Sequence, residues 1–414
     1  MLAPSFLLFS LALTPHDHGK LVDAVTAASA EMTELHKAVL ACRSILEETE
    51  TVSNRITGED AVLCVQLPSK SLKLVRVLGG ISRTDGYTVQ LIRRNGANSD
   101  YKVVRPEGGK VLGIKTNVTS IKVKAGTKLL KIKGKHGHST SKRVQLFKER
   151  AVSTIYAPYS EAVREPAAIR HGFDYVVSMI DEARDSLDQL GVTSRLDLGK
   201  PIAERRLVTE VVPEKPVVPL IIIEHIDPIW IDEKGVRHSV ERVLVTIGLN
   251  GKMAYCFASS SAAANGIAQF IKPTYDRIRK AYPEAQLMPD YMEGMRNHLN
   301  AMKAQFLLAD YTLTALSQES RDKLMDGQHE EELGAYIAAA YNGGEHYAAP
   351  AYDNDSVTWD HSKPPLVAPK KLKGKKRDAW YRSQLIKQHR IPAQTVTYVR
   401  EFRQVYEYLF VHHE

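Results

Sequence analysis

The chain has 414 residues, a formal net charge of +8 and a sequence pI of about 9.1. Its hydrophobic share of 43% and charged share of 25% are ordinary for globular proteins, and its length favours two or three domains over one. The basic balance favours an acidic partner, whether nucleic acid, an anionic lipid surface or an anionic cell-wall polymer.

Cysteine is scarce in this sequence. Cys42, Cys64 and Cys256 are odd in number and lack metal-ligand spacing, so the sequence implies neither a disulfide framework nor a zinc site. A single Cys64–Cys256 bridge is the alternative to three free thiols.

Residues 1–20 begin with an apolar run that ends at Thr14 and Pro15. The run is too short to span a bilayer as a helix, which needs about 20 residues, and no other stretch is suited to crossing a membrane. It is typical of the core of an export signal, although the usual preceding positive charges are missing, and a buried strand or helix turn is the alternative. We therefore expect an exported protein of the periplasm or cell envelope.

The next two regions differ in hydrophobic pattern. Residues 21–55 carry apolar positions at helical spacing and predict amphipathic helices. Residues 60–150 change to short alternating runs between glycine turns, which predicts a β-rich accessory domain.

This accessory domain is strongly basic. Between Glu107 and Glu149 there are eleven Lys or Arg and no acidic residue. Most of these lysines alternate with apolar residues, so we expect them to line one exposed sheet face. That face is either simply solvated or a surface for an anionic wall polymer or membrane; sparse aromatic residues disfavour nucleic acid.

Helical periodicity returns over residues 161–190 and predicts a linker helix within residues 155–195. Residues 211–228 follow, with prolines before an apolar run that ends abruptly at Glu224. Burial at such a helix end raises the pKa of a carboxyl group and keeps it protonated, as a general acid must be. A solvated glutamate is the commoner alternative for such a residue taken alone.

Three further segments complete the pattern. Residues 241–258 predict a β-hairpin, because two apolar runs flank Asn250 and Gly251. Residues 260–275 combine small residues with the amide of Gln269. Residues 336–344 predict a small-residue helix, and residues 395–409 predict a late helix.

In this order the segments resemble the goose-lysozyme-like lytic transglycosylases, the soluble lytic transglycosylase type. That family has a Val-Pro-led helix ending in Glu, then Ser-x-x-(Gly/Ala)-Ala-x-Gly-(Leu/Ile)-x-Gln, Ala-Tyr-Asn and Thr-x-x-Tyr-Val. The chain matches with Glu224 and residues 260–269, 340–342 and 395–399, and residues 291–316 match the family's long central helix. The resemblance covers about half the chain, residues 200–414. Each motif is weak alone, and their order makes the resemblance specific.

The resemblance implies an α+β chain: a mainly α-helical lysozyme-like catalytic domain with a small β-hairpin, preceded by the β-rich domain and helical segments. It implies cleavage of peptidoglycan glycan strands between N-acetylmuramic acid and N-acetylglucosamine, leaving 1,6-anhydromuramic ends, without metal or cofactor. Glu224 would be the single acid and base. The implied substrate-binding residues are Ser260, Gln269, Phe270, Tyr341, Asn342 and Tyr398.

The chain departs from the family in two places. His225 stands where serine usually follows the acid, which removes a hydroxyl group and makes His225 a further candidate for substrate binding. The separation between Glu224 and Gly266 is 42 residues, and an alternative alignment would put Gly248 at the acid's place and make the enzyme inactive. Glu241 is a poor substitute because it precedes a predicted strand.

Residues 353–390 form an elaboration between the last two motifs. They predict either a solvated loop or a lid whose aromatic residues Trp359, Trp380 and Tyr381 bind sugar beside a basic run. Two other functions stay open: a hydrolytic muramidase on the same fold, and an inactive wall-binding scaffold.

Overall fold

A computed structural model describes residues 34–49, 61–67, 69–77, 81–84, 87–90, 102–104, 110–133, 139–260, 262–369 and 371–411. The predicted export segment, residues 1–20, lies outside these ranges, as do parts of residues 21–55. Within them the chain is mostly helical with small antiparallel sheets, which agrees with the predicted α+β class. No helix in the described ranges has the length and apolar character needed to cross a membrane.

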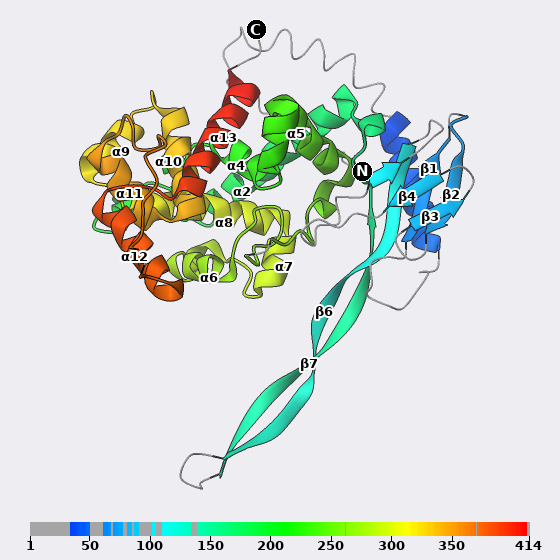
Figure 1. The fold of residues 1–414 in the computed structure, drawn as a ribbon, viewed down its shortest axis with the longest axis horizontal. Coiled ribbons are helices and arrows are strands. Elements are labelled where there is room, and N and C mark those ends of the chain that lie inside the picture. Colours follow the sequence, from blue (N-terminus) through cyan, green and yellow to red (C-terminus); the bar gives the residue numbers. More distant parts are fainter. Residues whose placement is uncertain are drawn as a thin grey trace, which may run out of the picture.

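The first part of the chain is a helix over residues 34–48 and two sheets (Figure 1). One sheet has the strand order β2-β1-β6-β7 and the other β3-β4-β5, with antiparallel pairing throughout. The strands are β1 (Ala61–Gln66), β2 (Leu72–Val77), β3 (Ile81–Thr84), β4 (Tyr87–Gln90), β5 (Lys102–Val104), β6 (Lys110–Lys133) and β7 (Ser139–Tyr156).

Strands β6 and β7 are far longer than their neighbours. They pair from Ile114↔Tyr156 to Lys133↔Ser139, and beyond β1 they continue as a two-stranded ribbon that projects from the molecule (Figure 1). At the base of the ribbon, Lys115 donates hydrogen bonds to the carbonyls of Leu46 and Thr49 at 2.7 and 2.6 Å. This lysine therefore caps the end of the 34–48 helix.

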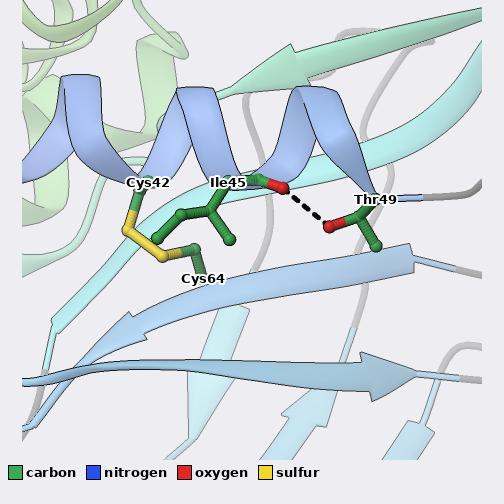
Figure 2. The surroundings of a disulfide bond; sticks show 4 residues. All are labelled: Cys42, Ile45, Thr49 and Cys64. Atoms are coloured by element: carbon green, nitrogen blue, oxygen red, sulfur yellow. Dashed lines mark hydrogen bonds between the residues drawn. A yellow bond between two sulfur atoms is a disulfide. The ribbon is translucent and has the colours of Figure 1, made fainter.

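A disulfide between Cys42 and Cys64 ties the 34–48 helix to β1 (Figure 2). The Cys64–Cys256 bridge was therefore the wrong pairing, because Cys256 is a buried free thiol in the helical part of the chain. Helix and sheet approach closely at this bridge. A Cβ added at Gly113 would lie 2.7 Å from Leu46 Cδ1 and 3.6 Å from Cys42 Cβ.

The rest of the chain is a helical unit around one apolar core. Helix α8 runs through it with almost every residue buried. Its apolar side chains pack on several sides, and its buried Asp310 accepts hydrogen bonds from Ser194 and Tyr282. The helices are α2 (Pro166–Gln189), α3 (Val208–Val211), α4 (Val217–Ile223), α5 (Pro228–Asn250), α6 (Lys272–Ala281), α7 (Tyr291–Arg296), α8 (His298–Leu313), α9 (Gln318–Leu324), α10 (Glu330–Gly343), α11 (Glu345–Asn354), α12 (Gly374–Lys387) and α13 (Ala393–Phe410). Short 3-10 helices are η1 (Glu161–Val163), η2 (Arg195–Asp197), η3 (Ile202–Glu204), η4 (Gly251–Met253) and η5 (Pro283–Ala285).

The β-hairpin predicted over residues 241–258 is wrong. Residues up to Asn250 belong to helix α5, and Gly251 ends it with φ of 51°. The apolar run is buried on all sides of this helix, so it lacks helical periodicity and resembles a pair of strands. Asn-Gly favours a hairpin turn, but glycine equally favours a helix C-terminus.

The long central helix predicted over residues 291–316 is two helices, α7 and α8. Asn297 separates them, since its side chain accepts a hydrogen bond from Asn300 N at 2.9 Å and caps α8. Helix α2, predicted as a linker, packs along α5 and α8 with its apolar face inside the core.

A second apolar cluster joins the β-rich part to the helical unit. It combines residues of the 34–48 helix, β1 and β6 with Ala168 of α2 and Val245 and Leu249 of α5. Asn250 of α5 also joins the two parts by hydrogen bonds to Ala157, the residue that follows β7. Its side chain accepts a hydrogen bond from Ala157 N and donates one to Ala157 O, both at 2.8 Å.

Candidate active site

Glu224 ends helix α4, all of whose seven residues are buried. The apolar side chains of α4 fix the helix in the core and leave the half-buried carboxyl group at its end. Tyr398, from helix α13 and 9% exposed, donates a short hydrogen bond to Glu224 Oε1. The first and last of the sequence motifs therefore meet at one carboxyl group.

Burial is the larger of two opposing effects on Glu224. Burial raises the pKa of this carboxyl, and the hydrogen bond from Tyr398 lowers it by a smaller amount. The net effect is a rise from 4.5 to about 7. Burial also raises the pKa of Tyr398 well above its usual value, and the charge of Glu224 adds to that shift. Tyr398 is therefore a fixed donor, while Glu224 can both hold and release a proton near neutral pH.

Tyr341 lies at the end of helix α10 and close enough to Glu224 for its charge to raise the tyrosine pKa, after the larger effect of burial. Its hydroxyl donates to the carbonyl of Ala268, in the loop of the Ser-to-Gln motif. Its ring meets Phe270 edge-on at 5.7 Å. Phe270 is itself buried and packs on Tyr275. Phe270, predicted to bind substrate, thus supports Tyr341 from the core.

The polar groups of the Ser-to-Gln motif shape their own loop. Ser260 Oγ accepts a hydrogen bond from Ala264 N at 3.1 Å, and Gln269 Nε2 donates to Gly266 O at 2.7 Å. Gly266 has φ of 76°, and an added Cβ would lie 2.0 Å from Met295 O. Only glycine fits this close approach to helix α7. The motif therefore encodes a tight loop beside the carboxyl group.

His225 bridges the end of α4 to the same loop. Its Nε2 lies 2.7 Å from Ile267 O, and its ring stacks on Tyr255 with centroids 3.6 Å apart and 9° between planes. Burial lowers the pKa of His225 to about 3, so the ring is neutral and Nε2 carries the hydrogen that it donates to the carbonyl. His225 thus holds this loop against helix α4.

Asn342 joins the Ala-Tyr-Asn motif to the final motif. The fully buried Thr395 donates from Oγ1 to Asn342 Oδ1 at 3.0 Å, and Asn342 is otherwise exposed. The exposed amide nitrogen is available to a ligand.

The three aromatic residues of the elaboration lie elsewhere. Trp359 is buried, donates from Nε1 to Glu332 Oε1 at 2.8 Å and packs on Tyr352, so it belongs to the core. Trp380 and Tyr381 lie half-buried on α12 and touch each other edge-on. Within the described residues, no hydrogen bond or ring contact joins any of the three to Glu224.

The structure also places the two alternatives to Glu224. Gly248 lies where α5 crosses α2, and an added Cβ would be 2.3 Å from Ala168 O. Glu241 lies on α5 and is buried in ion pairs with Arg164 and Arg237, which hold its pKa below its usual value despite desolvation. Within the described residues, no hydrogen bond joins either residue to Glu224 or to its neighbours Tyr398 and Tyr341.

Sequence reasoning missed Glu401, one turn beyond Tyr398 on α13. It is buried, and burial is the main cause that raises its pKa to about 7; its Oε1 has no hydrogen-bond partner among the described residues. The spacing of three between Tyr398 and Glu401 places both on one helix face and was the available signal. Across the described residues, no group of three acidic, histidine or cysteine side chains forms a metal-binding cluster.

Comparison of the chain with protein-family models, curated proteins and solved structures finds no match. Its activity is therefore inferred from the site itself.

Proposed function

We propose that the chain is a peptidoglycan lytic transglycosylase with a goose-lysozyme-like catalytic domain and Glu224 as acid and base. The observation that supports this most directly is the half-buried carboxyl group of Glu224, whose pKa is about 7. The four ordered motifs or their loops meet around this group, and Tyr398 of the last motif binds it. A group of this pKa can give and take a proton within one reaction cycle.

In the proposed reaction, Glu224 protonates the oxygen between N-acetylmuramic acid and N-acetylglucosamine as the C1–O bond breaks. The resulting carboxylate removes the proton of the muramic C6 hydroxyl, whose oxygen forms the new bond to C1. One carboxyl group serves both steps, unlike the two acids of most glycosidases. Tyr398 holds the carboxyl group, while Asn342, Gln269 and Tyr341 position the sugar or its acetamido group.

The test is muropeptide mass spectrometry after digestion of purified sacculi. Wild type should release 1,6-anhydromuramic ends, and Glu224→Gln should release at least about a thousandfold less, as expected when the main acid and base is lost. Glu204→Gln, at an exposed position of η3, is the matched control and should keep full activity.

The other outcomes separate the rival functions. Reducing ends in place of anhydro ends would identify a hydrolytic muramidase. No digestion by folded wild type would favour the inactive wall-binding scaffold. Equal activity of wild type and Glu224→Gln would remove Glu224 from the mechanism.

The proposal includes export to the periplasm or cell envelope. The Cys42–Cys64 disulfide supports this, because structural disulfides persist mainly in oxidising compartments. The basic sequence of the β6–β7 ribbon fits contact with an anionic wall polymer or membrane surface.

A further inference from the structure

A pocket of about 390 Å³ lies between residues 359–366, helix α12 and the beginning of helix α13. Its inner wall is apolar and includes Trp359, Leu385 and Val396. The hydrogen bond from Trp359 to Glu332 and its buried ring contacts fix this wall. The pocket is thus supported by the core of the helical unit.

Two permanent cations, Lys363 and Arg390, line this pocket. The neutral polar residues Ser362 and Tyr381 and the ring of His361 line it as well, and none of the described lining residues is Asp or Glu. Neither Lys363 nor Arg390 forms an ion pair within the described part of the chain. The adjacent Asp360 is already bound by Arg403, at 3.1 and 3.0 Å. The pocket therefore combines apolar surface with two cations that form no close ion pair among the described residues, and the longer-range charge of Asp355 acts on Lys363.

Arg390 is held in place without losing its capacity to bind an anion. Its Nη2 donates to Pro364 O at 2.6 Å, which fixes the guanidinium to the segment of residues 359–366. A guanidinium has five N–H donors, so others stay available for a carboxylate. Lys363 adds a second, more mobile cation.

Helix α13 connects this pocket with the proposed active site. Val396 lines the pocket, and Tyr398, two residues further along the helix, binds Glu224. Residues two apart point to nearly opposite sides of a helix about 10 Å wide. Pro392 and Ala393 also line the pocket, so it reaches around the beginning of α13.

We infer that this pocket binds the carboxylate-ended peptide that peptidoglycan carries on its muramic sugar, with small apolar side chains against Val396 and Leu385. The inference rests on the proposed function, which places that sugar beside Glu224. Four or five extended residues span about 14–17 Å, enough to pass around the beginning of α13. The two cations and the absence of acid groups in the lining favour the terminal carboxylate over a neutral or cationic ligand.

The first experiment measures binding without catalysis. The tetrapeptide released from sacculi by an amidase, and the same peptide with its terminal carboxyl amidated, are titrated calorimetrically into Glu224→Gln. The acid should bind at least about tenfold more tightly than the amide, the difference expected for one charge-assisted hydrogen bond. Equal affinity of the two peptides, or no binding of either, would overturn the inference.

The second experiment compares peptide-bearing glycan strands with strands stripped of peptide. Arg390→Gln and Lys363→Gln should each raise KM for the peptide-bearing strands about tenfold and leave KM for stripped strands unchanged. Lys387→Gln, an exposed change on α12 outside the pocket lining, is the control. Lys363→Gln keeps the test valid if Arg390→Gln weakens the fold through its lost bond to Pro364.

The outcomes distinguish the two proposals. Anhydro products from wild type with no selective effect of the pocket variants would reject the pocket and keep the transglycosylase. Tight binding of the acid peptide by a protein that digests neither strand would reject the transglycosylase and keep the pocket.

Discussion

At the residue scale, Glu224 is governed by burial and by a single donor. Burial favours the neutral acid, and Tyr398 favours the carboxylate; their sum places the pKa at about 7. A general acid is active only while protonated, so the activity of wild type should decline as pH rises through this pKa.

Tyr398→Phe should move that decline to higher pH. Without the hydroxyl, the carboxylate loses a charge-assisted hydrogen bond, so the pKa of Glu224 should rise further, by about one unit. The pH dependence of kcat/KM on solubilised glycan strands measures the shift. An unchanged or lower pKa in the variant would contradict this account of the site.

His225→Ser introduces the serine found after the acid in the lytic transglycosylases that the sequence resembles, and should weaken the fold. At neutral pH the variant should lose about 1–2 kcal/mol, since it gives up the bond to Ile267 O and the stacking on Tyr255.

The pH dependence of His225→Ser gives a second readout. The folded-state pKa of His225 is lowered to about 3, against about 6.5 when unfolded. The unfolded chain therefore binds an extra proton between these values, and wild type loses stability as pH falls through this window. Urea unfolding at pH 7 and pH 5 should show a smaller loss in the variant. Parallel losses in both proteins would contradict the assignment.

At the element scale, the sequence predicts some features better than others. The helix ending at Glu224 was predictable, because prolines begin it and an apolar run ends at one charged residue. The helical structure of the apolar run in α5 was not predictable. This run is buried on all sides, so it lacks the hydrophobic periodicity that distinguishes a helix from a strand. Likewise, periodicity in α2 indicated a helix but not which neighbours cover it.

The crossing of α2 and α5 depends on two glycines. An added Cβ at Gly172 would lie 1.9 Å from Leu244 O, and one at Gly248 would lie 2.3 Å from Ala168 O. Both clashes involve backbone, so rotating a side chain does not relieve them. The α5 glycine that suggested an inactive alignment has a packing role.

Gly248→Ala should therefore destabilise the protein by about 1–3 kcal/mol, because the two helices must separate to admit a methyl group. The measurement is the urea midpoint at constant pH. Gly199→Ala is the control, since Gly199 is exposed and its added Cβ meets nothing within 4 Å. Equal midpoints for the two variants would refute the close crossing.

At the scale of the whole molecule, the site is assembled from parts far apart in the chain. Glu224 and Tyr398 are separated by 174 residues. The four motifs or their loops meet only because α4, α10, α13 and the loop of residues 260–269 share one core. Their order in the sequence suggested the meeting, but the supporting role of Phe270 and the pocket behind α13 depend on packing that no motif encodes.

The Cys42–Cys64 disulfide is a second long-range contact that the spacing of the cysteines in the sequence did not predict. Cys42 and Cys64 are separated by 22 residues and lie on a helix and a strand, whose packing brings their Cα atoms to 5.6 Å. Gly113 of β6 permits that approach, and the same cluster continues through Ala168 and Val245 into the helical unit. Stability of the β-rich part is therefore linked to the bridge and to its contact with α5.

Reduction of the bridge should lower the unfolding free energy of the β-rich part by about 3 kcal/mol, the loop-closure entropy for a separation of this length. The measurement is urea unfolding, with and without dithiothreitol, followed by hydrogen exchange in β1 and the 34–48 helix. The control is a Cys42→Ala/Cys64→Ala double variant, which keeps only the free thiol of Cys256. Its unfolding free energy should equal that of reduced wild type and should not change when dithiothreitol is added. Reductant sensitivity that persists in the double variant would show that the effect does not come from the Cys42–Cys64 bridge. Unfolding of wild type that does not respond to reduction would show that packing through the second cluster, without the bridge, holds the helix on the sheet.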